Sequence, residues 1–282
     1  MNKEHWTFII RARTGWFDLK LGQLWEYRDL ISIFVKRDFS TAYKQTILGP
    51  FWHLLQPLVS SLVFSFVFSY IGRIPHGEIP SVLFYLSGIV PFSYFSDCTT
   101  RTSSIFTSNA NLFGKVYFPR LAAPLAVVIS NLIKFGIQMF LFLTIWMIFF
   151  FRPDNVLHPN LYILLLPIML FIMALLGLGI GLIISSLTIR YRDLTNLLGF
   201  GVQFLMYMSP VILPVSIWPE KVQWITYVNP LSPIVDTFRY GFLGISGFNG
   251  MHLLYSFCVS CILFLLGILI FNKAEKNFID TV

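Results

Sequence analysis

The residues best placed to do chemistry in this 282-residue chain are polar side chains inside long apolar stretches. They form two sets, each recurring at helical spacing. The first set is Tyr94, Asp97, Arg101, Ser104 and Ser108, and the second is Ser130, Asn131, Lys134 and Gln138. An isolated charge in the middle of a bilayer costs several kcal/mol, so it faces a partner, water or a pathway. Two hypotheses follow. Either Asp97 pairs with Arg101 or Lys134 and ties two helices together, or these groups line a polar route.

The sequence contains no residue pattern typical of catalysis, metal binding or nucleotide binding. The five histidines are scattered over different segments: His5, His53, His76, His158 and His252. Cys258 and Cys261 have the spacing of half a metal site, but without a second pair two small buried thiols are the better interpretation. The sequence has no Gly-x-x-x-x-Gly-Lys-Ser/Thr phosphate loop, and residues 113–115 lack its first glycine and its hydroxyl. We therefore predict no catalytic residue, no metal and no cofactor in this chain.

Six apolar stretches must position these polar groups. Apolar residues make up 56% of the chain and charged residues only 12%, about half the charge of a soluble domain. About 20 apolar residues cross the hydrocarbon core, and a helix satisfies the backbone hydrogen bonds there. The predicted spans are 50–72, 80–105, 121–150, 161–188, 195–216 and 252–272. The expected fold class is an all-α integral membrane protein with six transmembrane helices. Gly177, Gly179 and Gly181 in the fourth span predict close helix packing.

A charge-rich leader precedes the spans, so we divide the chain into a cytoplasmic or interfacial leader, 1–48, and a six-span domain, 49–282. One helical face of the leader is apolar, and it comprises Leu24, Tyr27, Leu30, Ile31, Phe34 and Val35. Such a helix lies in the membrane interface with its apolar side in the acyl boundary. The alternative is a helix that packs its apolar face on a partner.

The basic residues predict the orientation in the membrane. If the leader is cytoplasmic and the six spans alternate, the cytoplasmic segments hold fifteen Lys and Arg and the outer segments hold four. This excess predicts that both termini are cytoplasmic. The net charge of +7 is then spread over a membrane surface. Nucleic-acid binding would need these basic residues together on one face of a soluble domain, so this function is not indicated.

The segment 214–247 is too polar and too rich in proline for a seventh span. It predicts two short helices on the outer side, the second capped by Ser232 with Pro233 at its first position. Several aromatic residues gather there. We predict an outer gate that includes Trp218, Trp224, Tyr227 and Tyr240.

Three stretches of the sequence resemble a known family. The first runs Trp25-Glu-Tyr-Arg-Asp-Leu, continues to Val35-Lys-Arg-Asp-Phe, and ends in Leu48-Gly-Pro-Phe-Trp52. The second is Asn111-Leu-Phe-Gly-Lys-Val-Tyr-Phe-Pro-Arg120. The third is Asn229-Pro-Leu-Ser-Pro233, followed by Asp236-Thr-Phe-Arg239. Together with the topology they resemble the permease subunits of type-2 ABC exporters for polysaccharides such as O-antigen, capsule and teichoic acid. The resemblance covers nearly the whole chain.

The resemblance implies a function and partners. It implies a homodimer in the bacterial inner membrane that exports a lipid-linked polysaccharide, with O-antigen as the first candidate. Two copies of a separate subunit would bind Mg and ATP. The implied contacts with that subunit are Asn111, Phe113, Lys115, Tyr117, Arg120, Arg190 and Arg192. The alternatives are a type-2 ABC exporter of drugs or small lipids, and a membrane-embedded enzyme that transfers glycans or acyl groups.

A polysaccharide route needs hydrogen-bonding groups and flat apolar faces, because sugars stack on aromatic rings. The predicted channel residues are Trp52, Phe66, Tyr70, Asp97, Arg101, Lys134, Gln138, Phe204 and Tyr207. For the aromatic residues the alternative is lipid contact, since Phe commonly faces lipid and Trp and Tyr gather at membrane interfaces.

Overall fold

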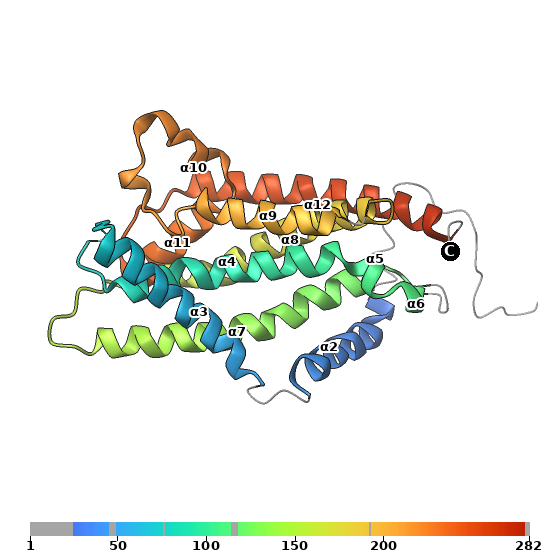
Figure 1. Ribbon diagram of the computed structural model, residues 1–282, viewed down its shortest axis with the longest axis horizontal. Coiled ribbons are helices and arrows are strands. Elements are labelled where there is room, and N and C mark those ends of the chain that lie inside the picture. Colours follow the sequence, from blue (N-terminus) through green and yellow to red (C-terminus); the bar gives the residue numbers. More distant parts are fainter. Residues whose placement is uncertain (1–24, 45–48, 76, 114–117, 192, 280–282) are drawn as a thin grey trace, which may run out of the picture.

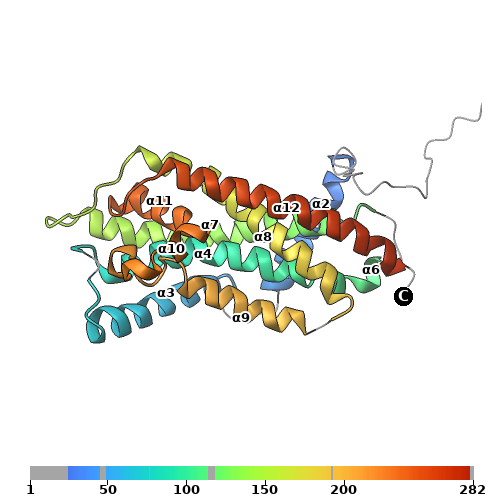
Figure 2. The same ribbon diagram turned by 90° about the horizontal axis from the view of Figure 1, so that it is seen from above.

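The computed structural model describes residues 25–44, 49–75, 77–113, 118–191 and 193–279. The elements of regular structure in these ranges are helices. The long ones lie side by side along the longest axis of the molecule (Figures 1 and 2). The all-helical part of the predicted fold class is therefore confirmed.

Helix α4 (Ser81–Ser103) is the centre of the bundle. It contacts α7 (Ala122–Phe150), α8 (Leu166–Thr188) and α3 (Phe51–Phe64), and α8 also packs along α12 (Gly250–Ile279). Side chains on all sides of α4 are buried. A helix in this position need not be apolar enough to face lipid, which explains how α4 accommodates its Ser, Thr and charged residues.

Four helices of the described residues are long and apolar enough to cross a membrane: Phe51–Ile71, Ala122–Phe150, Leu161–Thr188 and Gly250–Ala274. They correspond to the first, third, fourth and sixth predicted spans. The second span, α4, has 23 residues but is too polar to meet the same standard. The fifth, α9 (Leu194–Tyr207), has 14 residues and ends well before the predicted boundary at 216. That length covers about 21 Å at 1.5 Å per residue, less than the hydrocarbon core.

The glycines of α8 allow three helices to approach closely. A Cβ atom added at Gly181 would lie 2.5 Å from the Thr102 side chain of α4, and one at Gly179 would lie 2.6 Å from the Leu263 backbone of α12. The predicted packing role of this glycine series is therefore confirmed.

The two ends of the bundle carry different short elements. At one end, here called the α2 end, lie α2 (Arg28–Tyr43), α5 (Ile105–Ser108), α6 (Ala110–Phe113) and the C-terminal part of α12 (Figure 1). At the other, the α11 end, lie α10 (Trp224–Val228) and α11 (Ser232–Leu243). The 3₁₀ turns Val215–Ile217 and Glu220–Val222 precede them.

The apolar face of α2 packs on protein. Phe34 is buried in a cluster with Phe106, Phe113, Phe118 and Phe271, and its ring lies 5.7 Å from the Phe118 ring. Other residues of the predicted face are partly buried against the same cluster: Tyr27, Leu30, Ile31 and Val35. The predicted amphipathic face therefore exists, and much of it is covered by the bundle.

Helix α11 begins one residue before the predicted first position, Pro233, and the predicted cap is wrong. Ser232 is the first residue of the helix and Pro233 follows it, but Leu231 is the N-cap residue. The buried Ser232 hydroxyl has no hydrogen-bond partner in the described part of the chain. Asn229 organises this turn instead, because its Oδ1 accepts a hydrogen bond from the Leu231 backbone at 3.0 Å. Its Nδ2 donates to the Ser209 hydroxyl at 2.8 Å.

Candidate functional site

An ion pair joins the two polar sets found in the sequence. Lys134 Nζ of α7 lies 2.6 Å from Asp97 Oδ2 of α4, and the two side chains are 14% and 22% exposed. The pair forms because α4 and α7 pack along each other, which brings the two polar helix faces together. Of the two partners considered for Asp97, Lys134 makes the contact.

A small polar cavity adjoins this pair. It has a volume of about 20 Å³ and is lined by Lys134, His53, Arg101, Ser130 and Asn131, together with Asp38 and Phe39 of α2. The Ser130 hydroxyl and the Asn131 Oδ1 are buried and have no hydrogen-bond partner in the described part of the chain. A cavity of this size is large enough for one water molecule, and the two unpartnered groups are of the kind that a buried water would bind.

Gln138 lies one turn further along α7 and is buried against α4. Its Oε1 accepts a hydrogen bond from the Ser93 hydroxyl at 2.6 Å. This contact uses the predicted channel residue to hold α4 and α7 together.

A larger crevice opens at the α2 end between α2, α4, α5 and α7. Its volume is about 420 Å³, and its polar lining includes Arg37, Asp38, Arg101, Ser108 and Asn109. Arg101 lines both this crevice and the small cavity beside Lys134. Polar groups therefore continue from the surface of the α2 end to the ion pair inside the bundle.

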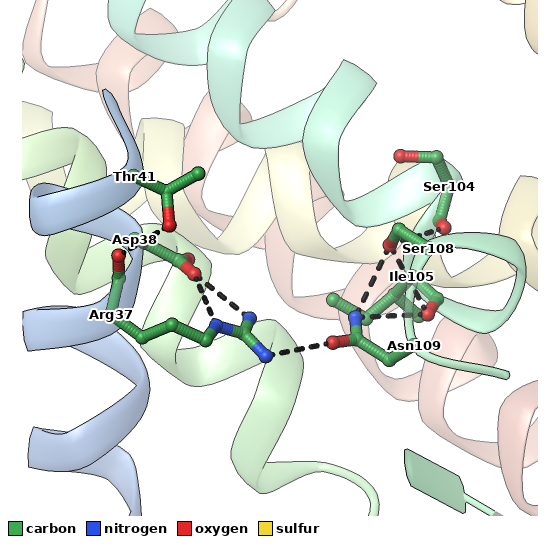
Figure 3. Close-up of polar contacts among 7 residues, drawn as sticks. All are labelled: Arg37, Asp38, Thr41, Ser104, Ile105, Ser108 and Asn109. Atoms are coloured by element: carbon green, nitrogen blue, oxygen red, sulfur yellow. Dashed lines mark hydrogen bonds and ion pairs between the residues drawn. The ribbon is translucent and has the colours of Figure 1, made fainter. Parts of the chain in front are cut away.

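Arg37 bridges α2 to the segment that follows α4, as Figure 3 shows. Its Nη1 donates to Asn109 Oδ1 at 3.1 Å, and its Nη2 pairs with Asp38 at 2.8 Å. Asn109 in turn donates through Nδ2 to the Ile105 carbonyl and the Ser108 hydroxyl, each at 3.2 Å. A displacement of α5 would therefore pull directly on α2.

The residues predicted to contact an ATPase subunit are only partly described. Phe113 is buried in the aromatic cluster and 5% exposed, and the buried Arg120 lies over its ring at 5.5 Å. Phe113 can therefore support the predicted contact surface from below, but its side chain exposes almost no area to a partner subunit. Arg190 is exposed and lies over the Tyr191 ring. Lys115, Tyr117, Arg192 and the side chain of Asn111 lie outside the described residues.

The predicted channel aromatics are exposed on the outside of the bundle. They are Trp52, Phe66 and Tyr70 of α3 and its π-helical extension Ser65–Ile71, and Phe204 and Tyr207 of α9. The Phe66 and Tyr70 rings stack at 5.7 Å. The ion pair and Gln138 lie inside the helix bundle, so the structure does not bring the two groups of predicted channel residues to one wall.

The predicted gate residues lie along the α10 and α11 segment. Trp224 and Tyr227 of α10 are exposed. The Trp218 indole N–H is buried and has no partner in the described part of the chain. The Tyr240 ring of α11 packs edge-on against Tyr162 at 5.1 Å.

Arg239 is the site residue whose importance the sequence analysis missed. It is 1% exposed, and its guanidinium binds the carbonyls of Phe84, Pro210 and Val211 and the Ser87 hydroxyl. Its Cζ also lies 3.8 Å from the centre of the Phe84 ring. This one side chain fastens α11 to α4 and to the turn after α9. The available signal was an arginine on a helix whose neighbouring residues are mostly apolar.

Comparisons with known proteins agree with this architecture. Residues 29–243 match the ABC-2 type transporter family. An O-antigen export system permease protein RfbA of Klebsiella pneumoniae is 28% identical over 255 residues, which cover 89% of this chain and 94% of the relative. A protein of the same name from Myxococcus xanthus is 25% identical over 77% of this chain and 81% of the relative. The polysialic acid transport protein KpsM of Escherichia coli is 25% identical over 85% and 91%.

Proposed function

This chain belongs to the ABC-2 type transporter family, and we propose that it is the permease subunit of an exporter for a lipid-linked polysaccharide, with O-antigen as the first candidate. The observation that carries the proposal is the similarity to O-antigen export permeases over nearly the full length of both proteins. The chain itself would be no enzyme, and a separate subunit would bind Mg and hydrolyse ATP.

We place the chain in the bacterial inner membrane, with the α2 end on the cytoplasmic side. The excess of Lys and Arg in the segments that meet there supports this orientation. The ATP-binding subunit would dock on α5, α6 and the segment that follows, with Arg190 as a further contact. The Arg37–Asn109 hydrogen bond then gives a direct link from the docking surface to α2.

The crevice at the α2 end suits the head of a lipid-linked substrate. Arg37 and Arg101 line the crevice and Lys134 lines the small cavity that adjoins it, and together they carry more positive charge than Asp38 and Asp97 balance. Lipid carriers of glycans join sugar to lipid through phosphate groups, and guanidinium and ammonium groups bind phosphate through charge-assisted hydrogen bonds. The basic groups would therefore hold the anionic head on the cytoplasmic side.

Two copies of the chain would enclose the sugar path. The aromatic rows of α3 and α9 are exposed in a single protomer, so they are available to form a wall between two protomers. In this arrangement α4 and α9, the latter together with the turn that follows it, would complete a six-span domain, and α10 and α11 would form the outer gate.

A deletion strain tests the proposed function. We expect loss of polysaccharide from the cell surface and accumulation of lipid-linked polysaccharide inside the cell, with both restored by the wild-type gene. Affinity purification of the tagged chain should recover an ATPase subunit. Normal surface polysaccharide in the deletion strain would contradict the proposal, and altered drug or lipid export alone would point to a different cargo.

A further inference from the structure

A second large cavity lies at the α11 end, opposite the basic crevice. Its volume is about 500 Å³, within the range of about 300–1,000 Å³ typical of small-molecule sites. Its walls come from α10, α11, the start of α12 and the loop before α4. The polar side chains used in the argument are Thr226, Tyr227, Asp236, Asn249 and His252.

Two polar groups on these walls are available to a ligand. The Asp236 carboxylate forms no hydrogen bond or ion pair with any residue that the structure describes. Asn249 Oδ1 accepts hydrogen bonds from the backbone N–H groups of Met251 and His252 at 3.0 and 3.3 Å. This fixes the amide and leaves its Nδ2 as a donor. A carboxylate acceptor beside an amide donor suits a ligand with adjacent hydroxyl groups, each of which donates and accepts.

An aromatic face completes the set. The Tyr227 ring lies 5.2 Å from the His252 ring in an edge-on arrangement, and Tyr227 is about half exposed. The edge-on contact holds the tyrosine ring while leaving its surface partly open. Aromatic rings of this kind bind the C–H-rich face of a sugar.

The charge of this cavity makes it unsuitable for the anionic lipid head that suits the crevice at the α2 end. Among its described lining residues are one carboxylate and no Lys or Arg. The nearby Arg239 guanidinium is occupied by main-chain carbonyls and the Ser87 hydroxyl. A phosphate would be repelled by the Asp236 carboxylate and would find the N–H donors of Arg239 already used, whereas uncharged hydroxyl groups would not be repelled.

We propose that the cavity at the α11 end is a saccharide-binding site that holds a short, uncharged segment of the exported glycan as it leaves the transporter. This inference rests on the proposed function. The basic crevice would then handle the anionic lipid head, and the α11-end cavity the hydroxyl-rich sugar chain. Asp236 would accept hydrogen bonds from sugar hydroxyls, Asn249 would donate, and Tyr227 would stack.

Binding to the purified full-length chain in lipid nanodiscs tests this proposal. The probe is short oligosaccharide prepared from the delipidated surface polysaccharide of the host strain, and pyrophosphate serves as the charged comparison. We expect wild-type protein to bind the oligosaccharide without competition from pyrophosphate. Asp236→Asn and Tyr227→Ala should each weaken binding about tenfold or more, since each removes a charged hydrogen bond or a stacking face. Asp154→Asn, at an exposed position in the loop after α7, is the matched control and should bind as wild type.

Each outcome decides one proposal. Unchanged affinity in both variants, or no binding to wild-type protein, would overturn the saccharide site. If Asp236→Asn protein fails to assemble, Tyr227→Ala decides alone, because the tyrosine ring is exposed and its loss leaves the bundle intact. A wild-type gene that restores surface polysaccharide while its protein binds no oligosaccharide would refute this inference and leave the proposed function standing. Normal surface polysaccharide without the gene would refute the function itself.

Discussion

At the residue scale, the Lys134–Asp97 pair helps to hold α4 and α7 together, alongside the Gln138–Ser93 hydrogen bond. Its two members are mostly buried and 2.6 Å apart, so removing one leaves the other charge poorly compensated. We expect Lys134→Met and Asp97→Asn each to destabilise the protein by about 1–3 kcal/mol, less than for a fully buried pair because both side chains retain some exposure. The double variant should recover most of the loss in thermal unfolding measurements in detergent.

Export measured in the same variants separates the two roles. If the pair only joins the helices, export will recover with stability in the double variant. If Lys134 also serves the substrate, the double variant will be stable and export poorly. Unchanged stability and unchanged export in Lys134→Met would contradict both roles.

Asp236 makes the stability of the folded protein depend on pH. Burial raises the pKa of Asp236 to about 6, although the Arg239 charge opposes the shift. The pKa of Asp236 in the unfolded chain is about 4. At pH values between about 4 and about 6, the folded protein therefore holds a proton on Asp236 that the unfolded chain has lost. The stabilising contribution is therefore full at low pH and disappears as pH rises through 6. Tyr227 and His252 also face the cavity, so the test compares wild type with Asp236→Asn. At pH 8 the ionised carboxylate no longer stabilises the wild type, so Asp236→Asn should be the more stable protein. This difference in stability should shrink at pH 5, and an equal difference at both pH values would contradict the assignment.

At the element scale, the position of α8 depends on Gly179. An added methyl group there would meet main-chain atoms of α12 at 2.6–2.8 Å, which cannot yield as a flexible side chain would. We expect Gly179→Ala to cost about 1–3 kcal/mol. The matched control is Gly199→Ala on α9, where an added Cβ meets nothing within 4 Å and helix propensity favours alanine. Thermal unfolding of both variants checks the prediction, which fails if Gly179→Ala is as stable as the control.

The contact between α2 and α5 should carry the coupling to ATP hydrolysis. Arg37→Met removes the hydrogen bond to Asn109 and the ion pair with Asp38 but retains an apolar chain over the Phe34 ring. We expect normal membrane insertion, retained co-purification of an ATPase subunit and reduced export. Lys36→Met, at the exposed neighbouring position, should export normally. Wild-type export by Arg37→Met would show that coupling takes another route.

Local periodicity predicted the long apolar helices and the two polar faces, and the pairing of Asp97 with Lys134 was one of the two hypotheses left open for those faces. The bounds of α7 and the glycine contacts of α8 agree with the prediction. The short α9, the buried position of Phe113 and the role of Arg239 were not predictable in this way. Each depends on which helices become neighbours, and hydropathy carries no such information. Ser232 shows the same limit locally, since the side chain of Asn229 organises the turn that the serine was expected to cap.

At the scale of the whole molecule, this permease has two chemically different ends. The basic crevice at the α2 end would receive an anionic lipid head, and the α11 end would release an uncharged glycan. The sequence has no Gly-x-x-x-x-Gly-Lys-Ser/Thr loop, and the proposed separate subunit would supply the energy for movement between the two ends.

The most direct test measures ATP-driven movement of lipid-linked polysaccharide in inverted inner-membrane vesicles. The vesicles come from the deletion strain complemented with wild-type protein, and their outer surface corresponds to the cytoplasmic side. We expect ATP to move the polysaccharide into the vesicle lumen, where an added glycosidase cannot reach it. Neither a non-hydrolysable ATP analogue nor vesicles lacking the chain should give this protection. Equal protection with and without ATP, or with and without the chain, would contradict the assignment of this protein as a polysaccharide export permease.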